Sequence, residues 1–141
     1  MQAFTVSDYL HIVHRPDLSM LVARWLRPVS AAETREGYLQ ILEAARQSHC
    51  PYWLLDGRRR LPADAETTRW GFEEYFPHLR AQVGQVVFLS QLISPAYQQV
   101  THTIAAFQQN EHNPSPAYRM RLFNDEAQAV AWLRSCQQEP L

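Results

Sequence analysis

The sequence predicts one α/β domain, residues 1–141, built from a single mixed β-sheet of about five strands with about four helices packed on it. The chain has 141 residues, of which 46% are hydrophobic and 19% charged, as expected of one globular domain. Short apolar segments alternate with segments of helical spacing in the order β-β-α-β-α-β-α-β-α. Residues 52–55, Tyr-Trp-Leu-Leu, form an apolar run without polar alternation. Such a run is typical of a strand buried on both faces, and it marks the centre of the sheet.

The first two strands are expected at residues 9–14 and 18–27. Arg15-Pro16-Asp17 lies between them. Proline and aspartate suit the two central positions of a tight turn, so the strands should pair antiparallel.

Two helices flank the central strand. Ser30 and Glu33 form a capping box that starts a helix ending near Ser48. Asp64 caps the next helix, which is rich in aromatic residues and should be kinked or restarted at Pro77.

The remaining segments complete the pattern. Residues 85–89 predict a second buried strand, parallel to the first. Ser94-Pro95 predicts the start of a helix over about 95–108. Residues 118–123 alternate apolar and basic residues, which indicates an edge strand with one solvated face. Asn124 is expected to cap the last helix.

Composition excludes several classes of function. The net charge is −1, which does not suit a nucleic-acid binder. All 13 basic residues are arginine, so neither a Schiff-base lysine nor a P-loop lysine is present. The four glycines form no glycine-rich nucleotide loop, and the six histidines show no metal-ligand spacing, so no cofactor or metal is expected.

The remaining compositional features concern the compartment. Cys50 and Cys136 lie far apart and belong to no CxxC pair, which favours free thiols in a reducing environment. The N-terminus does not resemble a signal peptide, and the longest apolar runs are too short for a membrane span. We therefore expect a cytoplasmic protein.

The end of the central strand carries the first candidate site. Asp56 and Gly57 are followed by Arg58, Arg59 and Arg60. Ligands of open α/β sheets gather at the carboxyl ends of strands, and guanidinium groups bind carboxylate or phosphate in a forked geometry. These residues therefore indicate a site for an anion or an acidic partner. The alternative is that Asp56 holds the loop, one arginine pairs with it, and the others are solvated.

The aromatic helix carries the second candidate site. Trp70 and Phe72 differ by about 200° around an α-helix, so the aromatic side chains of this helix cannot all face one core. The surplus aromatic surface should meet a loop, a cavity or a partner. A partner or a second copy of the chain is one interpretation, and a core with one exposed ring is the other.

Four features of this order of elements belong together: the N-terminal strand pair, WLLDGR at the end of the third strand, VVFLS in the fourth, and RLFNDEAQAVAWL at the C-terminus. In these features the chain resembles the STAS-like (SpoIIAA-like) domains of bacteria, and the resemblance covers nearly the whole chain. Where phosphorylation switches of this family carry a serine or threonine after the aspartate, this sequence has Gly57.

The resemblance implies a non-enzymatic regulatory module that binds a protein partner or forms a homodimer. The alternative is a carrier of a small apolar or acidic ligand, held in a cavity beneath residues 95–108 with the arginines at its mouth. A hydrolase that uses Asp56 and a histidine is a third hypothesis.

Overall fold

The fold is given by a computed structural model, which describes residues 2–61, 63–95 and 115–138, and only the backbone of residues 2–6. It contains one six-stranded sheet in which the strand order follows the sequence, β1-β2-β3-β4-β5-β6. The strands are β1 (Gln2–Val6), β2 (Leu10–Arg15), β3 (Met20–Trp25), β4 (Tyr52–Asp56), β5 (Val87–Leu92) and β6 (Tyr118–Phe123).

The sheet is mixed, as predicted. β1, β2 and β3 pair antiparallel, whereas β3 to β6 pair parallel. The turn between β2 and β3 lies where Arg15-Pro16-Asp17 predicts it, with the Leu18 N–H donating to the carbonyl of Arg15. β1 is a sixth strand beyond the five expected. Its register on β2 is interrupted by a bulge between Ala3 and Thr5.

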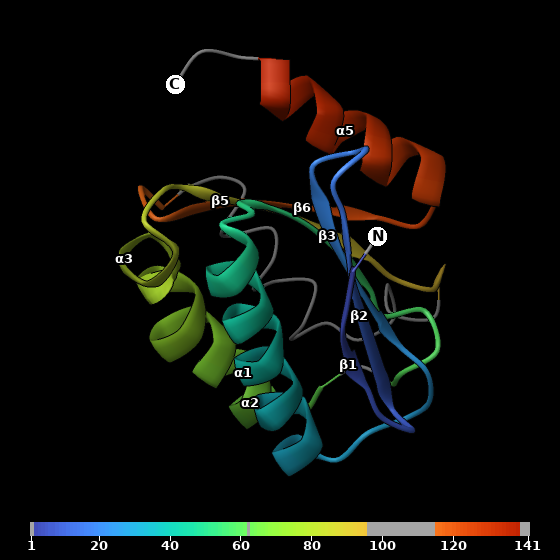
Figure 1. The fold of residues 1–141 in the computed structure, drawn as a ribbon. Helices are drawn as coiled ribbons and strands as arrows, with labels where there is room; N and C mark the ends of the chain where they lie inside the picture. Colours follow the sequence, from blue (N-terminus) through green and yellow to red (C-terminus); the bar gives the residue numbers. More distant parts are fainter. Residues whose placement is uncertain (1, 62, 96–114, 139–141) are drawn as a thin grey trace.

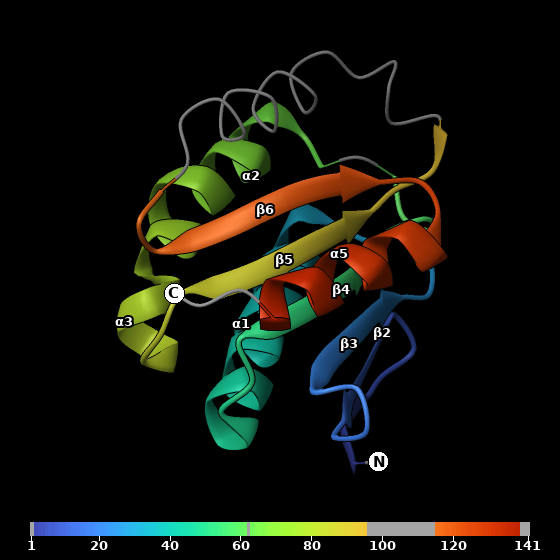
Figure 2. The same ribbon diagram turned by 90° about the horizontal axis from the view of Figure 1, so that it is seen from above.

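Helices cover both faces of the sheet (Figures 1 and 2). The described helices on one face are α1 (Ala31–Ser48), α2 (Ala65–Trp70) and α3 (Leu79–Val83), and α5 (Glu126–Gln138) lies on the other. The predicted capping box starts α1, because the Ser30 hydroxyl accepts from the Glu33 N–H and the Glu33 carboxylate accepts from the Ser30 N–H. α1 is capped at its C-terminus by His49, which adopts a left-handed conformation with φ 54°.

The segment between α2 and α3 departs from a regular helix. A π turn, η1, spans Gly71–Tyr75 and a 3₁₀ turn, η2, spans Phe76–His78. The Phe76 N–H donates to the carbonyl of Gly71, five residues back. The break therefore falls around Pro77, as predicted, because proline supplies no N–H to continue the α-helical ladder.

The core lies on both sides of β4 and β5. Trp53, Leu55, Val87 and Leu89 are all at most 1% exposed and lie in paired strands, which confirms the predicted central strands. These four side chains pack on the face of α1 and α3, and Leu54 packs on the face of α5.

The last strand is an edge strand, as predicted. Buried Tyr118 and Met120 alternate with exposed Arg119 and Arg121. The helix expected over 95–108 lies, apart from Pro95, outside the described residues. Within the described ranges, no helix is both long and apolar enough to cross a bilayer.

Candidate functional site

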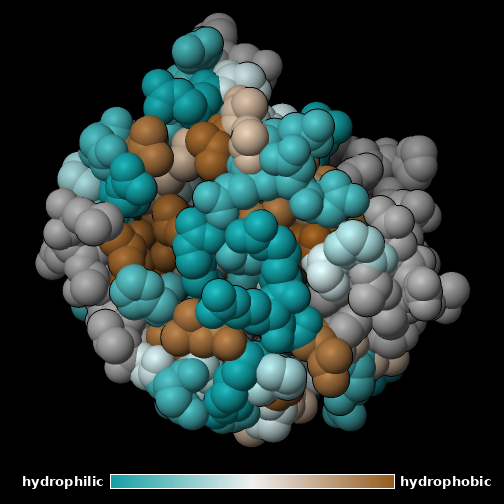
Figure 3. Space-filling model, turned by 90° about the vertical axis from the view of Figure 1, so that its right-hand side faces the viewer, coloured by the Kyte–Doolittle hydropathy of each residue, from teal (hydrophilic) through white to brown (hydrophobic). Residues whose placement is uncertain are grey.

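The loop after β4 sends its arginines to opposite faces of the sheet. The Gly57 N–H donates to the Leu92 carbonyl at 2.7 Å, and the Arg60 N–H donates back to the Gly57 carbonyl at 3.3 Å. This tight turn separates Arg58, on the face of α5, from Arg60, on the face of α1. Figure 3 views the molecule from the side where this loop lies in Figure 1, and hydrophilic surface gathers at its centre between smaller apolar areas.

On the face of α5, Arg58 belongs to an ion network. Asp56 accepts hydrogen bonds from Arg24 Nη1 at 2.7 Å and from Arg58 Nε and Nη2, both at 3.0 Å. Both arginines also bind Glu126, at the start of α5, at 2.7 and 3.3 Å. Burial would raise the pKa of the Asp56 carboxyl, but hydrogen bonds from the two arginines hold that pKa below its ordinary value. The network thus joins β3, β4 and α5.

On the opposite face, Arg60 is buried, with 8% of its surface exposed. Its Nη2 donates to the Thr34 hydroxyl at 3.2 Å, its Nε donates to the Leu61 carbonyl at 3.4 Å, and its guanidinium carbon lies 4.6 Å from the centre of the Trp25 ring. Neither hydrogen-bond acceptor is charged. No described carboxylate forms an ion pair with Arg60.

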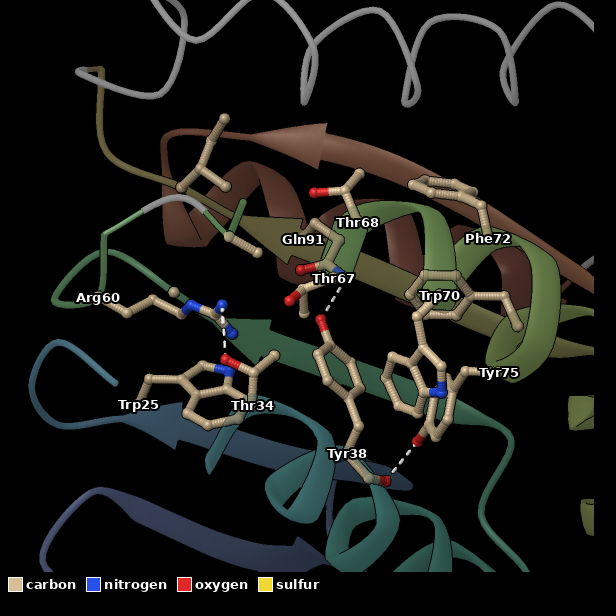
Figure 4. A pocket seen from close by; sticks show the side chains of 15 residues that line it. Trp25, Thr34, Tyr38, Arg60, Thr67, Thr68, Trp70, Phe72, Tyr75 and Gln91 are labelled. Atoms are coloured by element: carbon tan, nitrogen blue, oxygen red, sulfur yellow. Dashed lines mark hydrogen bonds between the residues drawn. The ribbon is translucent and has the colours of Figure 1, made fainter. Parts of the chain in front are cut away.

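Arg60 lines a cavity between α1, α2, η1 and the sheet. Its volume is about 60 Å³, several times what one buried water needs. Most of the described lining is apolar or aromatic. Figure 4 shows the arrangement: Arg60 and Trp25 lie at one end, Trp70, Phe72 and Tyr75 lie at the other, and polar groups lie between them.

The polar groups between the two ends come from three elements: Tyr38 of α1, Thr67 and Thr68 of α2, and Gln91 of β5. Gln91 Nε2 donates to the Tyr38 hydroxyl oxygen at 3.3 Å. The Tyr75 hydroxyl donates to the Tyr38 main-chain carbonyl at 2.6 Å. These bonds tie the cavity walls of α1, η1 and β5 together.

The aromatic end is a packed set of rings. The Tyr38 ring meets Trp70 at 6.3 Å and Tyr75 at 5.0 Å, both edge to face. Phe72 meets Phe76 at 5.2 Å between ring centres. Rings held in this way form a preformed wall.

Trp70, the last residue of α2, and Phe72, in the π turn that follows it, both line the cavity. Of the three places left open for the surplus aromatic surface, the described structure puts it at a cavity.

The candidate residues therefore separate into three groups. Asp56 and Arg58 are together in the ion network, whereas Arg60, Trp70 and Phe72 line the cavity. Arg59 is exposed on the loop.

Sequence reasoning missed the cavity residues Trp25, Thr34, Tyr38 and Gln91. Thr34 and Tyr38 lie one turn apart on α1, and Gln91 is a polar residue in the mostly apolar strand β5. Both features were visible in the sequence as isolated polar positions within buried elements.

The described lining supplies hydrogen-bond donors and rings, but no carboxylate, histidine or cysteine. Asp56 lies on the other face of the sheet, occupied by two arginines. No group of three or more histidine, cysteine, aspartate or glutamate residues suited to a metal ion occurs in the described part of the chain. Such a lining can bind and orient a molecule.

The STAS-like resemblance rests on the sequence motifs alone. Comparison with protein-family models, with curated proteins and with solved structures finds no match to this chain.

Proposed function

We propose that this protein is a non-enzymatic binding domain that holds a small acidic molecule in the cavity between α1, α2 and the sheet. The observation that carries the proposal is Arg60: a buried guanidinium that lines the cavity and has no acidic partner among the described residues. The ligand-carrier alternative of the sequence analysis placed its cavity beneath residues 95–108, which apart from Pro95 lie outside the described residues, whereas the cavity proposed here is the one that Arg60 lines.

Four arginines that are more exposed than Arg60 make the contrast clear. Arg15, Arg24, Arg27 and Arg58 each pair with at least one carboxylate, although their side chains are 36–42% exposed. Burying a charge without a counter-charge is far more costly than leaving it half exposed. Arg60 should therefore gain most from an anion, because its hydrogen bonds to Thr34 and Leu61 and its contact with Trp25 supply only part of the compensation.

The second candidate is the function implied by the STAS-like resemblance: a regulatory module of the bacterial cytoplasm that binds a protein partner or its own copy. Leu61 favours it, because this large apolar side chain is 68% exposed beside the exposed Arg59. An exposed apolar and a charged residue on one loop suit a protein contact.

A thermal-shift screen of small anions tests the first candidate. We compare the wild type with Arg60→Met, which keeps an unbranched apolar stem, and with Arg59→Met as the matched control on the same loop. An anion at 100 times its Kd should stabilise the wild type and Arg59→Met by about 2.7 kcal/mol. Arg60→Met should show little of this gain. Equal stabilisation of all three proteins would place the anion elsewhere, and no stabilisation by any anion at low salt would contradict the proposal.

Native mass spectrometry of freshly purified protein separates the two candidates. A small co-purifying mass that is absent from Arg60→Met supports the ligand carrier. A dimer at micromolar concentration that Trp70→Ala or Phe72→Ala weakens, with no small mass, supports self-association instead.

A further inference from the structure

We infer that the ligand is a one-ring aromatic monocarboxylate, with its carboxylate on Arg60 and its ring against Trp70 and Phe72. This inference rests on the proposed function and names the class of ligand. It specifies three properties of the ligand: the charge of its anionic group, the aromatic nature of the rest of the molecule, and the size of the whole molecule.

The charge follows from the donors at the Arg60 end. A guanidinium has five N–H donors, and two of them are used by Thr34 and Leu61, so three remain. The Thr34 hydroxyl donates its proton to the Ser30 carbonyl at 2.9 Å, so it supplies no donor for a ligand. The first-turn N–H of Thr67 is likewise taken by Asp64 at 2.7 Å. Arg60 thus offers one positive charge and N–H donors without a partner among the described residues, which match the single charge and the two oxygens of a carboxylate.

A phosphate fits this end less well. It carries a charge of about −1.5 to −2 at neutral pH and presents three acceptor oxygens. Arg60 alone would leave part of that charge unmatched in a mostly apolar cavity, where an unmatched charge is costly.

The aromatic body follows from the opposite end. Trp70, Phe72 and Tyr75 present rings there, and the one hydroxyl among them is turned to the Tyr38 carbonyl. The surface left toward the cavity is therefore mostly aromatic. Flat rings pack against such walls edge to face or offset, and so gain more than a saturated body of the same size.

The size follows from the two ends of the cavity. A single ring with a short acid chain is a small molecule that carries both a carboxylate for Arg60 and a flat ring for Trp70 and Phe72. The Tyr38 hydroxyl accepts a hydrogen bond from Gln91. It can therefore donate its own proton to a polar atom of the ligand that lies between the ring and the carboxylate.

Isothermal titration with a matched series tests the inference. The probes are phenylacetate, its neutral amide phenylacetamide, phenyl phosphate, cyclohexylacetate and acetate. Phenylacetate should bind most tightly. Phenylacetamide should bind at least tenfold more weakly, and cyclohexylacetate severalfold more weakly. Arg60→Met should lose at least tenfold in phenylacetate affinity, Arg60→Lys should lose less, and Arg59→Met should bind as the wild type does.

A second pair of variants tests the aromatic end. Phe72→Leu should weaken phenylacetate severalfold and leave acetate unchanged, and Phe72→Ala should do so more strongly if circular dichroism shows it folded. The ligand class would be overturned if phenyl phosphate bound more tightly than phenylacetate, or if cyclohexylacetate and phenylacetate bound equally well. The proposed function would still stand in that case, provided that binding depended on Arg60. If no probe binds in an Arg60-dependent way, both fail.

Discussion

The ion network at the end of β4 makes a sharp prediction for Asp56→Asn. Asp56 accepts four hydrogen bonds: one from Arg24 at 2.7 Å, and three from the side chain and main chain of Arg58 at 3.0, 3.0 and 3.2 Å. Asparagine keeps the shape of the side chain but removes its charge, and it turns an N–H group toward two cations. The substitution therefore tests the charge and leaves the packing in place.

The burial of the three side chains sets the magnitude. Breaking a fully buried ion pair costs about 3–5 kcal/mol, and breaking an exposed pair costs about 0–1 kcal/mol. Asp56 has 10% of its side chain exposed, but Arg24 has 36% and Arg58 has 42%. Water therefore screens the arginine side of the network, and we expect a loss of about 1–3 kcal/mol in the free energy of unfolding.

Urea denaturation at pH 7 measures this loss, with Asp17→Asn as the matched control. Asp17 makes a similar two-pronged contact with Arg15, at 2.8 and 3.1 Å, but their side chains are 60% and 40% exposed. The control should lose clearly less stability than Asp56→Asn, because water screens the exposed pair. Equal losses in the two variants would refute the argument from burial.

The pH dependence gives a second readout of the same reasoning. The pKa of Asp56 is lowered in the folded protein, so its charge stabilises the fold above the ordinary pKa of aspartate, and this contribution is lost as pH falls through the folded pKa. The gap in stability between wild type and Asp56→Asn should therefore narrow below about pH 4. A gap that stays constant down to the acid transition would show that Asp56 does not act through its charge.

Three further predictions concern the core. Leu55→Ala should cost about 2–5 kcal/mol in urea denaturation because Leu55 is fully enclosed in the central strand, and a loss under about 0.5 kcal/mol would contradict that assignment. Gly37→Ala should cost about 1–3 kcal/mol, because its Cβ would lie 2.4 Å from the Trp25 ring, whereas Gly57→Ala, whose Cβ meets nothing closer than 3.5 Å, should cost less. Burial raises the pKa of Tyr118 to about 12, so its contribution to stability is complete below pH 10 and is lost as pH rises toward 12. Alkaline denaturation of Tyr118→Phe should lack that decline.

The sequence by itself determined the order and type of most elements, because the signals involved are local. The apolar run at residues 52–55 became the central strand β4, and the Ser30–Glu33 capping box became the start of α1. A cap joins residues three apart, and an apolar run without alternation can be buried only between two layers. The five-residue strand β1 carries no such signal, and its pairing with β2 decides it.

Only the tertiary structure decided where the candidate residues meet. Arg58 and Arg60 are two positions apart, yet one joins a network with Glu126 and the other lines a cavity with Tyr38 and Gln91. Their partners lie 22 to 68 residues away along the chain and are brought close by strand pairing and helix packing, which no local pattern encodes. The π turn that follows Trp70 likewise has no signal in the sequence, because sequence spacing assumes a regular α-helix. The sequence therefore showed which residues carry charge and aromatic surface, and the fold determined which of them share a site.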